Sequence, residues 1–140
     1  MFKKLLNKKL LKNQKGLTLI ELLAVIVILA IVAAIAIPAI GNIIENSRIK
    51  GMKADIANVI SAANIYKTEN SQVPPKVSDL GDFLQTPGTI SKDSTFSLVD
   101  KEIAISGTAI VNKETYTLTN VKLSTLKTDD KDLDDTGISK

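Results

Sequence analysis

The chain has no cysteine, no histidine and no tryptophan among its 140 residues. Without cysteine it offers no disulfide framework, no zinc finger and no thiol nucleophile. Without histidine it lacks the usual general base of enzymes and the commonest metal ligand of proteins. We therefore expect neither an enzyme nor a bound cofactor, and the three Phe and two Tyr allow only a modest folded core.

Acidic residues are missing from the first fifteen positions, which hold six lysines: Lys3, Lys4, Lys8, Lys9, Lys12 and Lys15. The formal net charge of +3 comes from this run, because the rest of the chain has 12 basic and 15 acidic residues. This remainder is net acidic and has Arg48 as its only arginine, so we expect no direct nucleic-acid site. Lysines directly before an apolar segment are typical of the cytoplasmic flank of a membrane helix.

Charged residues are nearly absent from residues 17–40, where Glu21 is the one exception, and Leu22 to Ile37 contains only Leu, Ala, Val and Ile. A helix of these 24 residues would be about 36 Å long, enough to cross the hydrocarbon core of a bilayer. The lysines in the basic leader, residues 1–16, would keep that end in the cytoplasm and place the C-terminal body outside.

Residues 41–70 predict the amphipathic half of the same helix. Their apolar side chains recur every three or four positions, and polar residues such as Lys53 fall between them. The apolar stripe consists of Ile49, Met52, Ile56, Val59, Ala63 and Tyr66. No clear stop signal separates the two halves, because a proline can bend a helix as well as end one, so we expect one helix over 17–70, bent near Pro38.

Residues 71–126 predict a small globular domain with antiparallel strands, which makes the fold class α+β. Pro74 and Pro75 end the helix, and residues 78–84 suggest a turn or short helix. A period of two then appears in the pairs Phe96 and Leu98, Ile103 and Ile105, and Tyr116 and Leu118. Breaks at Asp100-Lys101, Ser106-Gly107 and Asn112-Lys113 indicate three or four short strands. The helix stripe can cover their apolar face.

The acidic tail, residues 127–140, holds five aspartates and almost nothing apolar, so we expect it to be solvated. Asp130, Asp132 and Asp134 alternate like the start of a calcium loop and form a weak candidate metal site. Asp135, however, takes the place where such a loop needs glycine, and no glutamate follows.

Two short patterns fit the Ser-x-x-Lys motif of serine acylases, at Ser47 to Lys50 and at Ser124 to Lys127. Neither has the accompanying elements that would form a site, and two chance matches are expected in a lysine-rich chain.

Three interpretations of the apolar segment remain open on composition alone. It can be a cleaved secretory signal with Ala34-Ile35-Ala36 as a small-x-small cleavage site. It can be an uncleaved single-span anchor of a binding protein. A plain anchor leaves Glu21 unexplained, because a carboxylate deep in a bilayer costs up to about 3.5 kcal/mol.

The third interpretation rests on Gly16-Leu17-Thr18-Leu19-Ile20-Glu21, the alanine-rich run and Pro38. Together they resemble the N-terminus of type IV pilins and of the pseudopilins of secretion and DNA-uptake systems, closely over residues 12–45. The resemblance implies a prepilin that prepilin peptidase cleaves between Gly16 and Leu17 and then N-methylates on Leu17. Leu17 departs from the phenylalanine that family members most often carry there.

The same resemblance implies a structural subunit of a type IV pilus or pilus-like filament. Its precursor would be a single-pass protein of the cytoplasmic membrane, and its filament would lie on the cell surface. Its partners would be further copies of itself, prepilin peptidase, and the pilus assembly platform with its ATPase. The alternative within the family is the major pseudopilin of a competence or type II secretion system.

Glu21 and Pro38 are the residues that we expect to matter in assembly. Cleavage creates an ammonium at Leu17, and in a filament Glu21 of one copy can face that amine of the next. Removing one partner of a buried ion pair costs about 3–5 kcal/mol, so the pair would reject misplaced subunits. Pro38 removes the bond to the Ala34 carbonyl and weakens the helix, and the resemblance implies unwinding there, although many relatives have glycine where this chain has Ala30.

Overall fold

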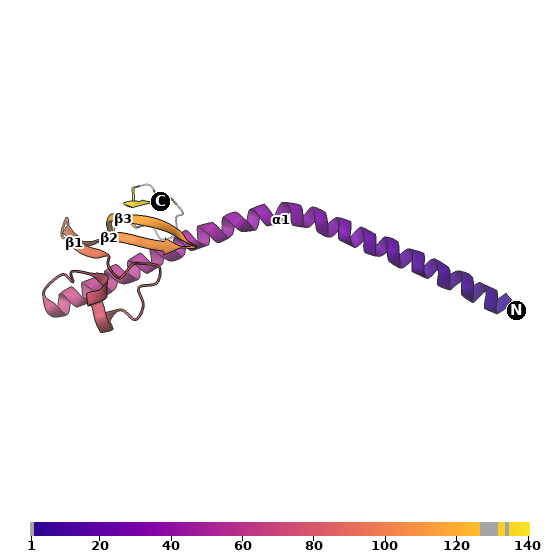
Figure 1. Ribbon diagram of the computed structural model, residues 1–140, viewed down its shortest axis with the longest axis horizontal. Coiled ribbons are helices and arrows are strands. Elements are labelled where there is room, and N and C mark those ends of the chain that lie inside the picture. The colour runs from indigo at the N-terminus through magenta and orange to yellow at the C-terminus, as the bar shows by residue number, and fades with distance from the viewer. Residues whose placement is uncertain (1, 127–131, 134) are drawn as a thin grey trace. The chain divides into compact units, whose positions relative to one another are not determined.

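The computed structural model describes residues 2–126, 132, 133 and 135–140, and over residues 2–17 it describes the backbone alone. Two compact units divide the chain, one ending at Ile43 and the other running from Ile44 to Lys140. The elements, in chain order, are α1 (Phe2–Asn70), η1 (Val77–Phe83), β1 (Thr95–Val99), β2 (Glu102–Val111), β3 (Glu114–Lys122) and β4 (Ile138–Ser139) (Figure 1).

Helix α1 begins at Phe2, so a helix start at residue 17 is wrong. The leader is rich in lysine and leucine, which are good helix formers, and α1 continues through Gly16 despite the low helix propensity of glycine. Pro38 lies inside α1, and the helix continues on both sides of it. A proline removes only one backbone hydrogen bond, and Ala34, Ala36 and Ala39 around it have the highest helix propensity.

The second unit places a four-stranded antiparallel sheet, in the order β1-β2-β3-β4, against the second half of α1 (Figure 1). The α+β class is therefore confirmed. Residues 71–126 hold three of the strands, within the predicted three or four, and the fourth strand, β4, lies in the acidic tail. Two of the predicted breaks are two-residue hairpin turns, because both residues of Asp100-Lys101 and of Asn112-Lys113 have positive φ. Such turns match the right-handed twist of the strands that they join.

The third predicted break is wrong, because Ser106 and Gly107 lie inside β2. The pairing register with β3 shifts between Ile105 and Gly107, which is the sign of a β-bulge. A Cβ atom at Gly107 would lie 2.2 Å from the Ser94 Oγ. Glycine therefore marks a close approach of two backbone segments here, and not the end of a strand.

The core lies between the inner face of the sheet and the stripe of α1. The helix contributes the buried residues Met52, Ile56, Val59, Ile60, Ala62 and Ala63, and the strands contribute Ile103, Ile105, Tyr116, Leu118 and Val121 among others. Tyr66 packs edge-on against Phe83 of η1, with ring centroids 5.5 Å apart. The predicted stripe is thus the face that meets the rest of the domain.

Two residues of the second unit differ from expectation. Leu98 was predicted to face the core but is 53% exposed, because it lies near the end of β1, the edge strand of the sheet. Lys53 was predicted to be a surface residue but is fully buried. Helical spacing alone puts it on the flank of the stripe, where the C-terminal segment covers it.

The acidic tail is not solvated throughout. Ile138 and Thr136 are buried, and β4 pairs with β3 so that Ser139 lies opposite Thr117. Two apolar residues among aspartates are too few to form a visible strand pattern, which explains the wrong expectation. Residues 127–131 and 134, including the candidate ligands Asp130 and Asp134, lie outside the described residues.

Candidate processing and assembly segment

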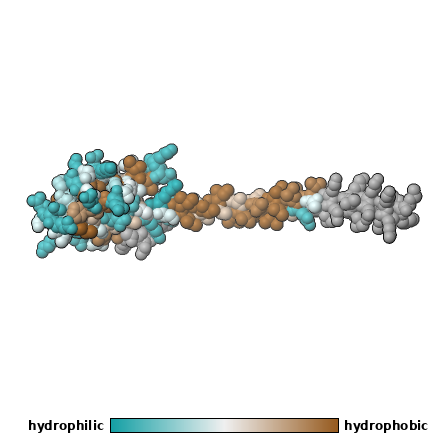
Figure 2. Space-filling view, turned by 90° about the horizontal axis from the view of Figure 1, so that it is seen from below, coloured by the Kyte–Doolittle hydropathy of each residue, from teal (hydrophilic) through white to brown (hydrophobic). Residues whose placement is uncertain are grey.

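Apolar side chains cover the face of the first unit that Figure 2 shows. Consecutive positions such as Val25, Ile26 and Val27 are all exposed, so the other sides of this part of α1 are apolar as well. From Leu19 to Ile44, each large apolar side chain leaves between 44% and 70% of its surface exposed. A helix that is apolar all round needs cover that it does not supply itself. The stretch from Thr18 onward is long and apolar enough to cross a membrane.

Glu21 lies on this apolar helix with an exposed side chain, one helical turn after Leu17. Positions four apart share a face of a helix and are separated by about 6 Å along its axis. The peptide bond between Gly16 and Leu17 is part of the helical backbone. A new amine at Leu17 would therefore start on the same face as Glu21, within the first turn of the shortened helix.

Pro38 and the alanines lie further along the same unit. Pro38, Ala33 and Ala34 are exposed, and Ala36 is half-buried. The Ala34 carbonyl loses its usual helical donor, because proline has no amide hydrogen. Small side chains on an exposed helix also permit another helix to approach closely.

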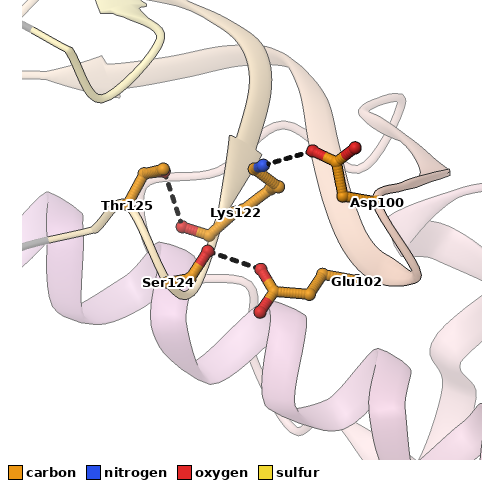
Figure 3. Close-up of polar contacts among 5 residues, drawn as sticks. All are labelled: Asp100, Glu102, Lys122, Ser124 and Thr125. Atoms are coloured by element: carbon orange, nitrogen blue, oxygen red, sulfur yellow. Dashed lines mark hydrogen bonds and ion pairs between the residues drawn. The ribbon is translucent and has the colours of Figure 1, made fainter.

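The polar contacts at one end of the sheet tie surface turns together (Figure 3). Lys122 Nζ lies 2.9 Å from the Asp100 carboxylate, and this hydrogen bond raises the pKa of Lys122 above its usual value. Ser124 donates its hydroxyl hydrogen to Glu102 at 2.5 Å. Asp100, Glu102 and Ser124 are all exposed. The cluster joins the β1–β2 turn to the end of β3 at the surface, and its Ser124 belongs to one of the two Ser-x-x-Lys patterns.

Of the three candidate calcium ligands, Asp132 alone lies among the described residues. Asp132 uses its backbone carbonyl to accept a hydrogen bond from Lys53. Within residues 2–126, 132, 133 and 135–140, no group of three His, Cys, Asp or Glu side chains could hold a metal ion.

The N-terminal part of the first unit matches a known protein family. Residues 11–37 match the family model described as the prokaryotic N-terminal methylation motif. The chain carries the N-terminal methylation motif of type IV pilin-like prepilins. No match was found among curated proteins or among solved structures.

The match confirms the resemblance that the N-terminal residues suggested. The motif implies that the prepilin is processed by prepilin peptidase and takes part in pilus assembly, and it points to a structural protein and not to an enzyme. A methylation motif that heads a long apolar helix also suits a membrane-anchored precursor.

The sequence gives no comparable signal for the burial of Lys53, because that burial depends on a segment 79 positions away.

Proposed function

We propose that the prepilin is the structural subunit of a type IV pilus or of a pilus-like filament, including those of DNA-uptake and secretion systems. The observation that carries this proposal is that the methylation motif heads a helix whose large apolar side chains are exposed from Leu19 to Ile44. Before assembly the bilayer covers these side chains. In the filament, the same helices of neighbouring copies cover them.

Maturation begins at the junction of the leader with the apolar helix. Prepilin peptidase cuts between Gly16 and Leu17 on the cytoplasmic side, and the new Leu17 amine is methylated. Glycine before the cut has no Cβ to exclude a closely approaching active site. Methylation leaves the amine basic, so the mature helix starts with a positive charge four residues before Glu21.

The Glu21 carboxylate then selects the position of each subunit. Within one copy, the positive end of the helix dipole favours Glu21 by some tenths of a kcal/mol, which is about a tenth of its cost in lipid. The Leu17 amine of a neighbouring copy offers a full opposite charge. A subunit that docks out of register strands both charges in an apolar bundle, at a cost of about 3–5 kcal/mol.

Pro38 and the alanines shape the packing of the bundle. Ala33 and Ala34 let neighbouring helices approach, and the unpaired Ala34 carbonyl is where α1 unwinds most easily. Ala30 favours the helix by about 1 kcal/mol over glycine, which confines the unwinding to the turn before Pro38.

Mass spectrometry of the purified protein tests this proposal. We expect the mature chain to start at Leu17, without residues 1–16 and with one added methyl group. Gly16→Val should leave the leader in place, and Gly41→Ala is the matched control, because a Cβ at Gly41 meets no other atom within 4 Å. A functional protein that keeps Met1 would instead be an uncleaved membrane anchor.

A further inference from the structure

Lys53 is the most deeply buried charged side chain among those described, with 0% of its surface exposed. It follows Met52 in the stripe of α1, and its Nζ donates to the backbone carbonyl of Asp132 at 2.5 Å. Burying an ammonium is costly unless hydrogen bonds compensate it. An unbranched apolar residue such as Met52 fills the same kind of space without that cost, so packing alone does not explain a lysine here.

The segment whose Asp132 carbonyl accepts from Lys53 ends in β4, which pairs with β3. We call residues 132, 133 and 135–140 the strap. Thr136 donates its hydroxyl hydrogen to the Leu133 carbonyl at 2.6 Å and closes a turn. The Gly137 carbonyl accepts from the Thr119 amide at 2.8 Å, and the Ile138 side chain enters the core.

The far end of the strap is fixed to β3 at the surface. Lys140 Nζ lies 2.7 Å from the Glu114 carboxylate, and this hydrogen bond lowers the pKa of Glu114. The strap also lies very close to β3, since Gly137 has φ +79° and a Cβ atom there would lie 2.3 Å from the Thr119 carbonyl oxygen. Its position is thus defined at both ends, by Lys53 and by β3.

We propose that the strap closes the outer edge of β3 and that Lys53 is the positioning residue that keeps it closed. β4 pairs with Thr117 and Leu118. When the strap lifts, these residues and the Thr119 amide become an open strand edge, which is a template for pairing with another chain. In this cysteine-free chain, the buried Lys53 ammonium holds the strap by a hydrogen bond instead of a covalent cross-link. Lys53 would hold the strap within a single subunit, whether or not that subunit joins a filament.

Amide hydrogen exchange of the full-length protein in detergent micelles tests the inference. In Lys53→Met, which keeps the length of the side chain, we expect the Thr119 amide to exchange at least about tenfold faster, because its partner Gly137 belongs to the strap. The Ile110 amide, which donates to the Thr89 carbonyl, should keep its rate. Lys122→Met is the control, since it removes a lysine that bonds Asp100 instead of the strap.

A removable cross-link completes the test. Thr117 and Ser139 lie opposite each other, so Thr117→Cys with Ser139→Cys should form a disulfide between β3 and the strap. In the Lys53→Met background, we expect slow Thr119 exchange when this bond is oxidised and fast exchange when it is reduced. The oxidised form also provides a folded starting state if Lys53→Met alone does not fold.

Two results would overturn the inference. Thr119 exchange that is unchanged by Lys53→Met, or unchanged on reduction of the locked variant, would mean that Lys53 does not hold the strap. An equal acceleration at Thr119 and Ile110 would mean that Lys53 stabilises the whole domain and not the strap.

Discussion

The two halves of α1 contain similar apolar residues and have opposite environments. In the first half, Ile28 and Leu29 each expose 59% of their surface, whereas Met52, Ile56 and Val59 in the second half expose none. The difference lies in the partner: η1 and the sheet cover one half, and the described part of the chain supplies no cover for the other. The apolar residues of a helix therefore show that its face must be buried. Which partner buries that face depends on the rest of the molecule or on its surroundings.

The largest expected effect concerns the first half of α1, where neighbouring copies are proposed to provide the cover. Glu21→Val should reduce the yield of sheared filaments to near zero, because the amine of the neighbouring copy would lose its partner at a cost of about 3–5 kcal/mol. The protein should still be inserted and cut after Gly16, which mass spectrometry would show. Glu69→Val, an exposed carboxylate in the second half, is the control. Normal filaments from Glu21→Val would contradict the assigned role.

The second prediction tests burial of the second half of α1 by the sheet of the same chain. Ile56→Ala should lower the free energy of unfolding of the second unit by about 2–5 kcal/mol, because it leaves a cavity in the core. Ile65→Ala, on the same helix but 53% exposed, should change it by less than about 0.5 kcal/mol. Chemical denaturation of the full chain in detergent, followed by the near-ultraviolet circular dichroism of the tyrosines, measures both. Equal losses of unfolding free energy in the two variants would mean that contact with the sheet does not decide which residues of this helix stabilise the fold.

A polar contact gives a smaller effect in the same half. Asp55 on α1 accepts hydrogen bonds from the Thr89 amide and from the Thr89 hydroxyl, both at 2.9 Å. Asp55→Ala should lower the free energy of unfolding by about 1–3 kcal/mol, because the amide then loses its partner. Asn58→Ala, an exposed neighbour on the helix, should have almost no effect in the same denaturation experiment. A neutral Asp55→Ala would show that water replaces the carboxylate.

The smallest effect concerns the exposed face of the second half. A Cβ atom at Gly51 meets no other atom within 4 Å, so Gly51→Ala should stabilise the helix by up to about 1 kcal/mol. Thermal unfolding of the variant should show a higher melting temperature. If the filament yield falls at the same time, then another copy packs against Gly51. Neighbouring copies would in that case cover part of the second half of α1 as well as the first half.

The sequence predicts the parts of the fold that repeat over many residues. The stripe from Met52 to Tyr66 and the alternation of Tyr116 and Leu118 in β3 are visible because burial recurs there at a fixed spacing. The cleavage motif around Gly16 is visible because its chemistry needs adjacent residues. These features predict the helix, the sheet and the processing site.

Single contacts between distant residues could not be predicted. Lys53 has the polar character of a surface residue, and its burial depends on Asp132, far along the chain. Gly107 has the local signature of a turn, and its role depends on the approach of Ser94. β4 has two residues, too few for a period of two to be seen. In each case the deciding partner is set by the fold and not by the neighbouring residues.

The core of the second unit draws its buried side chains from Met52 onward, so it is complete without the apolar half of the helix. On the proposed function, each subunit is therefore a prefolded module before it is extracted from the bilayer. Polymerisation then replaces lipid with neighbouring helices around the first unit, so the work of extraction from the bilayer concerns the first unit alone.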